Sequence, residues 1–458
     1  MTTYSKNSLK GLTSLRFKNF RSWLDTGEIR IAPLTGLFGT NSSGKTAIIQ
    51  FLLMLKQTIE SSDLKRVLYI GDEKSYVDLG TPSNFIYQHR FPAELDFSLT
   101  WDLPEVLEIM DDELLSFKIS SLIFKANIQV NTENIMLKNM SYSWSQTDNK
   151  NISFGMQQEK DPNTGETKAE LLSEPKDYLR RSRGRPWTLP QPIKFYRFPD
   201  QIYSYYQNTS FLSDIVLAFE KLFKNIYYLG PLRDYPRRSY LWAGEPPQDV
   251  GKNGELTIAA LLASRKKEKT DSYYIEQQVA KWLRELGLIY DFQLYEIVPN
   301  QQYEVRVKCT ENASEVLITD VGFGVSQILP VLVLCYYAPP GSILIFEQPE
   351  IHLHPSAQSG LSDVFIDVIK NRNMQIIIES HSEHLLRRLQ RRIAEEKINK
   401  EDTALYFCQL DDEGNSQLNS LQLDEFGNIN NWPTNFFGDE MGDLIAMTEA
   451  AIKRQQKS

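Results

Sequence analysis

A glycine-rich segment, Gly39–Thr46 (GTNSSGKT), carries phosphate-binding residue types in the order G-x-x-x-x-G-K-[ST]. Glycines let the backbone wrap an anion with its N–H groups pointing inward, while a lysine brings positive charge to the β and γ phosphates. A threonine hydroxyl at the last position can ligate Mg²⁺. We therefore predict that ATP and Mg²⁺ bind here, with Thr46 on the metal. The predicted nucleotide contacts in this loop are Gly39, Asn41, Ser42, Ser43, Gly44, Lys45 and Thr46.

The elements on either side of this loop have the required types. Leu34–Phe38 (LTGLF) predicts a buried strand, and Ala47–Lys56 (AIIQFLLMLK) predicts an apolar helix. A helix that begins at the loop also points its N-terminal donors at the anion. A chance match in a Gly/Ser-rich turn is the alternative, and the strand and helix argue against it.

Two further strands end in polar residues. Ser342–Phe346 (SILIF) runs into Glu347-Gln348-Pro349-Glu350, and a carboxylate at the end of a buried parallel strand is suited to nucleotide-bound Mg²⁺. The alternative is an ordinary acid at a sheet edge. Gln375–Ile378 runs into Glu379-Ser380-His381-Ser382, where a polar residue can sense the γ-phosphate.

A second possible anion site lies in Asp320–Gln327 (DVGFGVSQ), which precedes the apolar helix Ile328–Tyr337. Gly322 and Gly324 permit close backbone approach. By itself this segment is only a glycine-containing helix start, with Gly324, Ser326 and Gln327 around the N-terminus.

Other polar residues have ordinary explanations. Of the five histidines, four are His352, His354, His381 and His384, but both pairs follow apolar strands, so we disfavour a zinc site. Gln88 is a candidate nucleotide-site glutamine that we interpret as a solvated loop residue. We interpret Arg180–Arg185 (RRSRGR) as a solvated loop rather than a phosphate-backbone contact, and the arginines of Glu383–Ile393 as a solvated helix face.

Composition limits the class of protein. A chain of 458 residues with 24% charged residues predicts two or three globular lobes. The net charge of −9 argues against non-specific electrostatic binding of DNA by the chain as a whole. Three widely spaced cysteines, a polar N-terminus and no long apolar run favour a cytoplasmic protein.

The order of the expected elements predicts an α/β ATPase head assembled from both ends of the chain. Residues 1–100 supply the phosphate-binding loop, and residues 291–458 supply the glycine-containing helix start, the acidic strand and the histidine tip. Between them, residues 101–290 contain short alternating strands and helices, which predict an inserted β-rich and helical region. No sustained heptad predicts a long coiled coil.

Taken together, five motifs resemble those of the ABC/SMC-like P-loop ATPases of bacterial anti-phage defence systems, in the OLD-like group. They occur in the order LRFKNF, GTNSSGKT, DVGFGVSQILPVL, ILIFEQPEIHLHP and IIIESHSEHLL, and the tail Trp432–Glu440 fits one branch of that group. In its size and as a stand-alone ATPase, the chain most resembles the ATPases of the Septu anti-phage systems, the PtuA family. The resemblance covers about residues 1–60 and 310–440 and leaves the middle of the chain uncovered.

The resemblance implies roles for individual residues. Glu347 takes the metal-side acid position, and His381 is the switch histidine. Gly324 and Ser326 belong to the signature motif that completes the ATP site of a partner protomer. Gln348 stands where the family usually has a catalytic glutamate, and an amide cannot take a proton from water, so slow hydrolysis is expected.

The expected function is therefore that of a regulatory ATPase. It would bind ATP and Mg²⁺ in a head-to-tail homodimer, or a higher homo-oligomer, and control a separately encoded nuclease of the HNH type, with DNA contacted through the complex. Two alternatives stay open: an SMC-like DNA-repair motor, and a self-contained metal-dependent nuclease that uses the histidine-rich segment.

Overall fold

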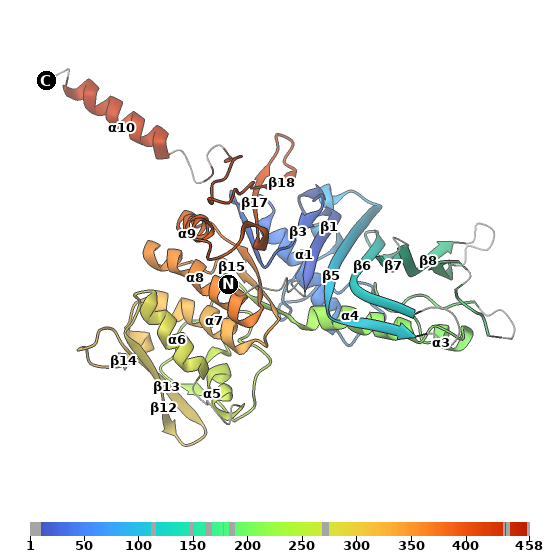
Figure 1. Cartoon of the computed structure of the whole chain (residues 1–458), viewed down its shortest axis with the longest axis horizontal. Helices are drawn as coiled ribbons and strands as arrows, with labels where there is room; N and C mark the ends of the chain where they lie inside the picture. Colours follow the sequence, from blue (N-terminus) through green and yellow to red (C-terminus); the bar gives the residue numbers. More distant parts are fainter. Residues whose placement is uncertain are drawn as a thin grey trace, which may run out of the picture.

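The computed structural model describes residues 11–110, 116–145, 151–160, 167–176, 178–182, 188–267, 274–433, 436 and 440–455. Within these residues the chain is an α/β protein, as the sequence predicts, and its strands form three sheets (Figure 1). The Arg180–Arg185 segment and the Trp432–Glu440 tail lie partly outside the described residues.

A mostly parallel sheet forms the centre of the molecule. Its strands are, in spatial order, β10 (Ile226–Leu229), β15 (Ile343–Glu347), β16 (Gln375–Glu379), β4 (Leu34–Gly39), β17 (Thr403–Leu410) and β18 (Ser416–Ser420). All neighbours are parallel except the last pair, β17 and β18. The carboxyl ends of β15, β16 and β4 therefore meet at one edge, where open α/β sheets bind their ligands.

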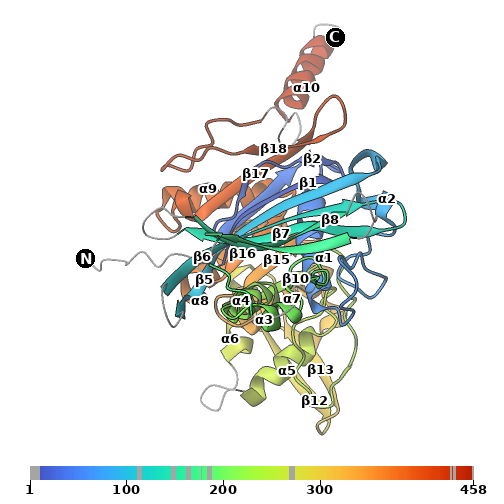
Figure 2. The ribbon, with the colours of Figure 1, turned by 90° about the vertical axis from the view of Figure 1, so that its right-hand side faces the viewer.

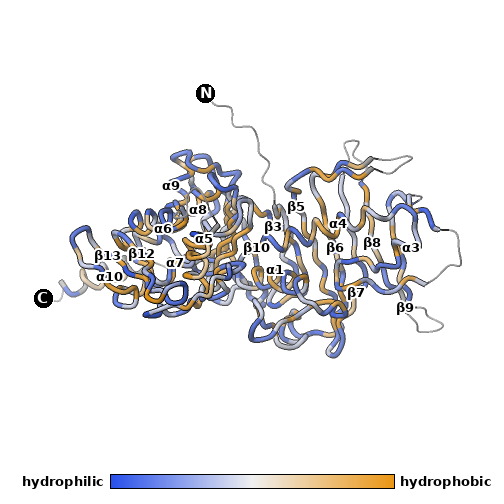
Figure 3. Tube along the Cα trace, turned by 90° about the horizontal axis from the view of Figure 1, so that it is seen from below, coloured by the Kyte–Doolittle hydropathy of each residue, from blue (hydrophilic) through white to orange (hydrophobic). Residues whose placement is uncertain are grey.

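A long antiparallel sheet packs beside the central one, as Figure 2 shows. Its strands are β2 (Trp23–Asp25), β1 (Leu12–Phe20), β5 (Ala93–Met110), β6 (Ser116–Val130), β7 (Ile135–Ser145), β8 (Asn151–Lys160) and β9 (Thr167–Glu174), with β3 (Ile29–Arg30) paired to β1. Buried and accessible residues alternate along β7, and hydrophobic and hydrophilic residues follow one another through this sheet (Figure 3).

The third sheet is small and carries β11 (Tyr240–Leu241), β13 (Gln302–Lys308), β12 (Asp291–Val298) and β14 (Val316–Leu317). The longer helices are α1 (Lys45–Glu60), α4 (Phe211–Lys224), α5 (Thr257–Lys267), α6 (Tyr274–Glu285), α7 (Phe323–Tyr337), α8 (Pro355–Arg372), α9 (Glu383–Ala394) and α10 (Glu440–Gln455). The short ones are α2 (Pro82–Phe85), α3 (Gln201–Tyr205), η1 (Tyr87–His89), η2 (Ile318–Asp320) and η3 (Lys400–Asp402).

The central strands separate two hydrophobic cores. Ile343 and Ile345 of β15 face the core shared with α1, α4 and the antiparallel sheet. Leu344 and Phe346 face the core shared with α5 to α9. Because both faces of the strand are covered, its sequence is apolar without alternation, and every residue of β15 is buried. This double burial holds the carboxyl end of β15 in a fixed position.

The predicted boundaries of the inserted region cut through structural units. Within residues 101–290, β10 pairs in parallel with β15 and is part of the central sheet. The antiparallel sheet begins before residue 101, because β1 and β5 are paired. A strand as short as β10 cannot be assigned to a sheet from its own sequence, since its pairing partner lies more than 100 residues later.

No helix of the described residues is long and apolar enough to cross a membrane. In Figure 1, α10 extends away from the rest of the chain near the C-terminus.

Candidate functional site

The phosphate-binding segment leaves the carboxyl end of β4 and enters α1. Gly39 has φ 136°, and a Cβ there would lie 2.0 Å from the carbonyl oxygen of Cys408. Gly44, the N-cap of α1, has φ 94°, and a Cβ there would lie 2.3 Å from Ser416 Oγ. Both positions therefore require glycine, because a side chain would be strained and would collide with the adjoining strands.

Lys45 lies inside the loop rather than in solvent, with 3% of its surface exposed. Its Nζ donates to the carbonyl oxygens of Gly39, at 3.1 Å, and Thr40, at 2.6 Å. Burial lowers the pKa of Lys45, although the Glu379 carboxylate opposes that shift. The ammonium group is thus held by neutral acceptors at the point where phosphate oxygens would offer stronger, charged ones.

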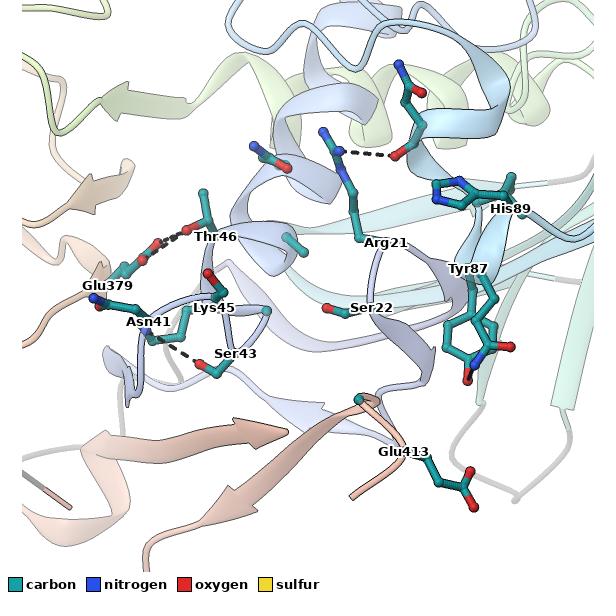
Figure 4. A pocket seen from close by; sticks show the side chains of 18 of the residues that line it. Arg21, Ser22, Asn41, Ser43, Lys45, Thr46, Tyr87, His89, Glu379 and Glu413 are labelled. Atoms are coloured by element: carbon teal, nitrogen blue, oxygen red, sulfur yellow. Dashed lines mark hydrogen bonds between the residues drawn. The ribbon is translucent and has the colours of Figure 1, made fainter. Parts of the chain in front are cut away.

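Thr46 faces a carboxylate from the neighbouring strand. Its Oγ1 lies 2.9 Å from each carboxylate oxygen of Glu379, the last residue of β16, and Figure 4 shows this pair beside Lys45. Glu379 is 3% exposed, and burial raises its pKa while Thr46 and Lys45 lower it. A hydroxyl and a carboxylate next to a phosphate-binding loop are the oxygen ligands that Mg²⁺ prefers.

Glu347 ends β15 directly beside Glu379, its register partner in the parallel pair. The Tyr228 hydroxyl donates to Glu347 Oε1 at 2.9 Å. Burial and the nearby Glu379 raise the pKa of Glu347 to about 8. Two buried carboxylates side by side repel each other, so a divalent metal would favour their ionised forms. The residues at this edge therefore fit a magnesium ion bound with a nucleotide.

Gln348 and His381 both line the cavity at this edge. Gln348 adopts the left-handed conformation with φ 45°, and its N–H donates to the Glu379 carbonyl at 2.8 Å. The His381 N–H donates to Glu350 Oε1 at 2.8 Å, and the Ser380 hydroxyl donates to the same oxygen at 2.8 Å. Burial and then Lys45 lower the pKa of His381, which favours the neutral imidazole.

The cavity has a volume of about 880 Å³ and brings together segments that are far apart in the sequence. Besides the loop, Gln348, Glu379 and His381, it is lined by residues of the β1–β2 turn, the η1 turn and the β17–β18 hairpin, including Arg21, Ser22, Tyr87, Gln88 and Glu413 (Figure 4). Gln88 is exposed in the η1 turn, as expected for a solvated loop residue, but it also lines this cavity, where its Nε2 donates to Tyr87 Oη at 2.7 Å.

The predicted catalytic and binding residues do not all share this cavity. Glu347, which accepts from Tyr228, is not among the lining residues. Gly324, Ser326 and Gln327 lie in the first turns of α7 and do not line it either. Ser326 Oγ donates to the Phe323 carbonyl at 2.8 Å, and the buried Gln327 Nε2 has no partner among the described residues.

Among the described residues, no group of three or more His, Cys, Asp or Glu side chains could hold a metal ion alone. His354 instead caps α8, where its ring accepts from the Ser356 N–H at 3.4 Å. The arginines of α9 are less solvated than the sequence predicts, because Arg388 and Arg392 both pair with Asp363, at 2.7 Å and 2.5 Å. That pairing joins α9 to α8.

Sequence reasoning missed Glu379, Tyr228 and Arg233 at this site. Glu379 carried a usable signal, since an acid ends a buried apolar strand there just as Glu347 does. Tyr228 and Arg233 belong to β10 and the segment after it, and nothing in the local sequence places them beside β15. Arg233 Nη2 donates to the carbonyl oxygens of Glu347, at 3.3 Å, and Gln348, at 3.4 Å.

Comparisons with known proteins give a family for most of the chain. A family model described as "AAA domain, putative AbiEii toxin, Type IV TA system" matches residues 34–387. A second, described as "Protein of unknown function (DUF3696)", matches residues 398–446. No curated protein matches the chain.

Solved structures similar to this chain include heads of SMC proteins. The SMC head bound to the C-winged-helix domain of ScpA is 12% identical, with a TM-score of 0.43 over 90% of this chain and 98% of that one. The SMC head domain from Thermotoga maritima is 11% identical, with a TM-score of 0.38 over 90% and 99%. A head with an extended coiled coil, bound to the C-terminal domain of ScpA from Pyrococcus furiosus, is 11% identical, with a TM-score of 0.41 over 90% and 96%.

Proposed function

This chain belongs to the AAA-domain family of P-loop ATPases whose model matches residues 34–387, and we propose that it is the ATP-binding regulatory subunit of an anti-phage defence complex. The observation that carries the ATP-binding part is the single cavity that joins Lys45, the Thr46–Glu379 pair, Gln348 and His381. Bound Mg²⁺ would supply positive charge at the β and γ phosphates. Thr46 and the acids at the ends of β15 and β16 would hold it.

The protein works as a head-to-tail homodimer or a higher homo-oligomer with ATP between protomers. Supporting this, the start of α7 with Gly324 and Ser326 lies outside the cavity, so these residues are left to act on a neighbour's nucleotide. Their position at a helix N-terminus suits an anion, because the N–H donors and the helix dipole both favour negative charge.

Turnover is slow compared with binding, so the protein acts more as a nucleotide sensor than as a motor. Gln348 lines the cavity where a general base would act, and an amide cannot accept the proton. A general base contributes about 10²–10⁴-fold to such a step. Glu350 is no simple substitute, because its Oε1 accepts from Ser380 and His381 and its carboxylate is buried.

Comparing the ATPase rate of the wild type with those of Gln348→Glu and Glu350→Gln tests this sensor role. We expect Gln348→Glu to raise the rate, since it restores an acid at the cavity, and Glu350→Gln to leave binding intact. Brisk wild-type turnover that persists in both variants would place the base elsewhere and contradict the sensor role.

The partner is a separately encoded nuclease of the HNH type, and DNA is contacted through the complex. This part rests on the resemblance of the motifs to the Septu ATPases and on the family description, which names a toxin of a toxin–antitoxin system. We expect nuclease activity only when the chain is purified with the partner encoded beside it. Metal-dependent cleavage by the pure chain, lost in His352→Ala or His384→Ala, would favour a self-contained nuclease instead.

A further inference from the structure

An arginine that no motif predicts holds the turn after β15. Arg233 follows β10 and is 7% exposed. Its Nη2 donates to the carbonyl oxygens of Glu347 and Gln348, at 3.3 Å and 3.4 Å. Burial lowers the pKa of Arg233 to about 10, so the guanidinium is still charged at neutral pH. A buried charge that binds only backbone carbonyls is costly, and its contact with Gln348, which lines the nucleotide cavity, therefore calls for an explanation.

The turn that Arg233 binds is strained. Gln348 has φ 45°, a left-handed conformation that is unfavourable for a residue with a side chain. The Gln348 N–H is fixed by the Glu379 carbonyl at 2.8 Å, and the Gln348 carbonyl is fixed by Arg233. With its backbone held from both sides, the Gln348 side chain lines the cavity. Arg233 therefore binds the backbone of the residue at the predicted catalytic-base position.

The segment that carries Arg233 continues to the start of α7. The ring centroids of Tyr235 and Phe323 lie 5.3 Å apart, and Phe323 is the first residue of α7. Phe323 in turn makes an edge contact with His352, at 5.1 Å between centroids. Arg238 pairs with Asp320 at 3.2 Å, just before α7. One short loop thus contacts both the backbone of Gln348, which lines the nucleotide cavity, and the helix start that lies outside it.

Arg233 also has unused hydrogen-bonding capacity in the described structure. Its Nε and Nη1 have no partner among the described residues, nor does Glu350 Oε2, and all three atoms are buried. Arg233 and Glu350 attract each other electrostatically without forming an ion pair in contact. Both residues therefore keep polar atoms that are not used in contacts among the described residues.

We propose that Arg233 is a positioning residue that holds Gln348 toward the γ-phosphate end of the cavity and, through Tyr235 and Phe323, transmits the nucleotide state to the start of α7. The inference rests on the proposed ATP binding and extends it, since it says how one protomer's nucleotide alters the surface offered to a neighbour. Physical continuity between the two places supports it, because loop residues contact both.

Arg372 provides a matched control for a purely structural role. Its Nη2 also donates to a backbone carbonyl, that of Ala338 at 2.7 Å, and its Nε also lacks a partner among the described residues. It lies at the opposite end of β15, where its own carbonyl accepts from the Gly341 N–H at 3.0 Å. Arg372→Gln therefore removes a similar contact far from the cavity.

The first measurement is the affinity for Mg²⁺-ADP and for a non-hydrolysable Mg²⁺-ATP analogue, by calorimetry. In Arg233→Gln we expect unchanged ADP affinity and about a tenfold smaller preference for the ATP analogue, because a charged hydrogen bond that positions Gln348 is lost. Arg233→Lys should recover part of the preference, and Arg372→Gln should keep all of it. A wild-type preference in Arg233→Gln, or an equal loss in Arg372→Gln, would overturn the proposal.

The second measurement is hydrogen exchange of the amides in residues 231–240 and 320–326, with and without the ATP analogue. We expect the analogue to change exchange in both segments of the wild type, and in Phe323→Ala to change it in residues 231–240 only. Phe323 is only partly buried, so this variant remains usable if Arg233→Gln fails to fold. An exchange change in residues 320–326 that persists in Phe323→Ala would refute the link.

Failure of the proposed function gives a different result. Lys45→Ala should lose both nucleotides, whereas Arg233→Gln loses only the preference between them. If the wild type bound neither nucleotide, ATP binding itself would be wrong.

Discussion

Glu347 should make the nucleotide-free protein less stable as the pH rises. Burial, together with the Glu379 carboxylate, raises the pKa of Glu347 from 4.5 to about 8, and the side chain is 6% exposed. The folded state therefore keeps the proton at pH values where the unfolded chain has lost it. Across that window each pH unit removes about 1.4 kcal/mol from the free energy of unfolding.

The sign follows from which state binds more protons. The contribution of Glu347 is fully present below pH 4.5, is lost as the pH rises, and is gone above about pH 8. Between pH 6 and pH 8 the expected loss is ~2–3 kcal/mol. Burial also raises the pKa values of Glu350 and Glu379, so they act in the same direction, and only a comparison with a variant isolates Glu347.

Urea unfolding at a series of pH values measures this effect. Glu347→Gln keeps the shape of the side chain and removes the titration, so its free energy of unfolding should fall less steeply over this range. Asp25→Asn is the control, because Arg16 lowers the pKa of Asp25 to about 2 and its contribution is constant above pH 6. Equal pH slopes in the wild type and Glu347→Gln would refute the assignment of a raised pKa.

Three further variants test the site. Lys45→Ala should reduce ATP binding below detection in calorimetry, because it removes the charge on the β and γ phosphates, and unchanged affinity would rule out the phosphate-loop assignment. Glu379→Gln should weaken the Mg²⁺ dependence of ATP affinity by about 10–100-fold, since its carboxylate adjoins Thr46, and an unaltered Mg²⁺ dependence would exclude it from the metal site. Gly324→Arg should prevent ATP-dependent dimerisation in mass photometry. Thermal unfolding must accompany that measurement, because a Cβ at residue 324 would lie 3.1 Å from the His352 carbonyl oxygen, and dimerisation equal to wild type would count against a composite site.

Local patterns predicted the elements that carry the motifs. The apolar run before the glycine-rich segment is β4, and the helix after it is α1, which begins at Lys45 rather than at Ala47. The apolar segments before Glu347 and Glu379 are β15 and β16. These predictions are confirmed because buried parallel strands and amphipathic or buried helices have patterns that can be read within about ten residues. The roles of the individual site residues stay predictions.

Which side chains meet could not be read in the same way. The sequence placed Glu347 on the metal with Thr46, yet the Thr46 hydroxyl contacts Glu379, because β16 lies between β15 and β4 in the sheet. The order of strands in the central sheet depends on how helices pack on both faces of that sheet. A local sequence pattern therefore does not predict this order. The position of Gln88 at the cavity also depends on a distant contact. The η1 turn that carries Gln88 is held by the hydrogen bond from Tyr87 to Asn415 of the β17–β18 hairpin.

The sequence by itself therefore determined the chemistry available: a phosphate-binding loop, acids and a histidine at strand ends, and a glutamine where a base is expected. The need for glycine at positions 39 and 44 also follows from the sequence motif, because a backbone that wraps a phosphate requires glycine there. Only the tertiary structure decided that β10 joins the central sheet, and hence that Arg233 binds the backbone of Gln348. The physical reason is that a contact between residues more than 100 positions apart depends on the packing of whole strands and helices. The local sequence around each residue does not predict such a contact.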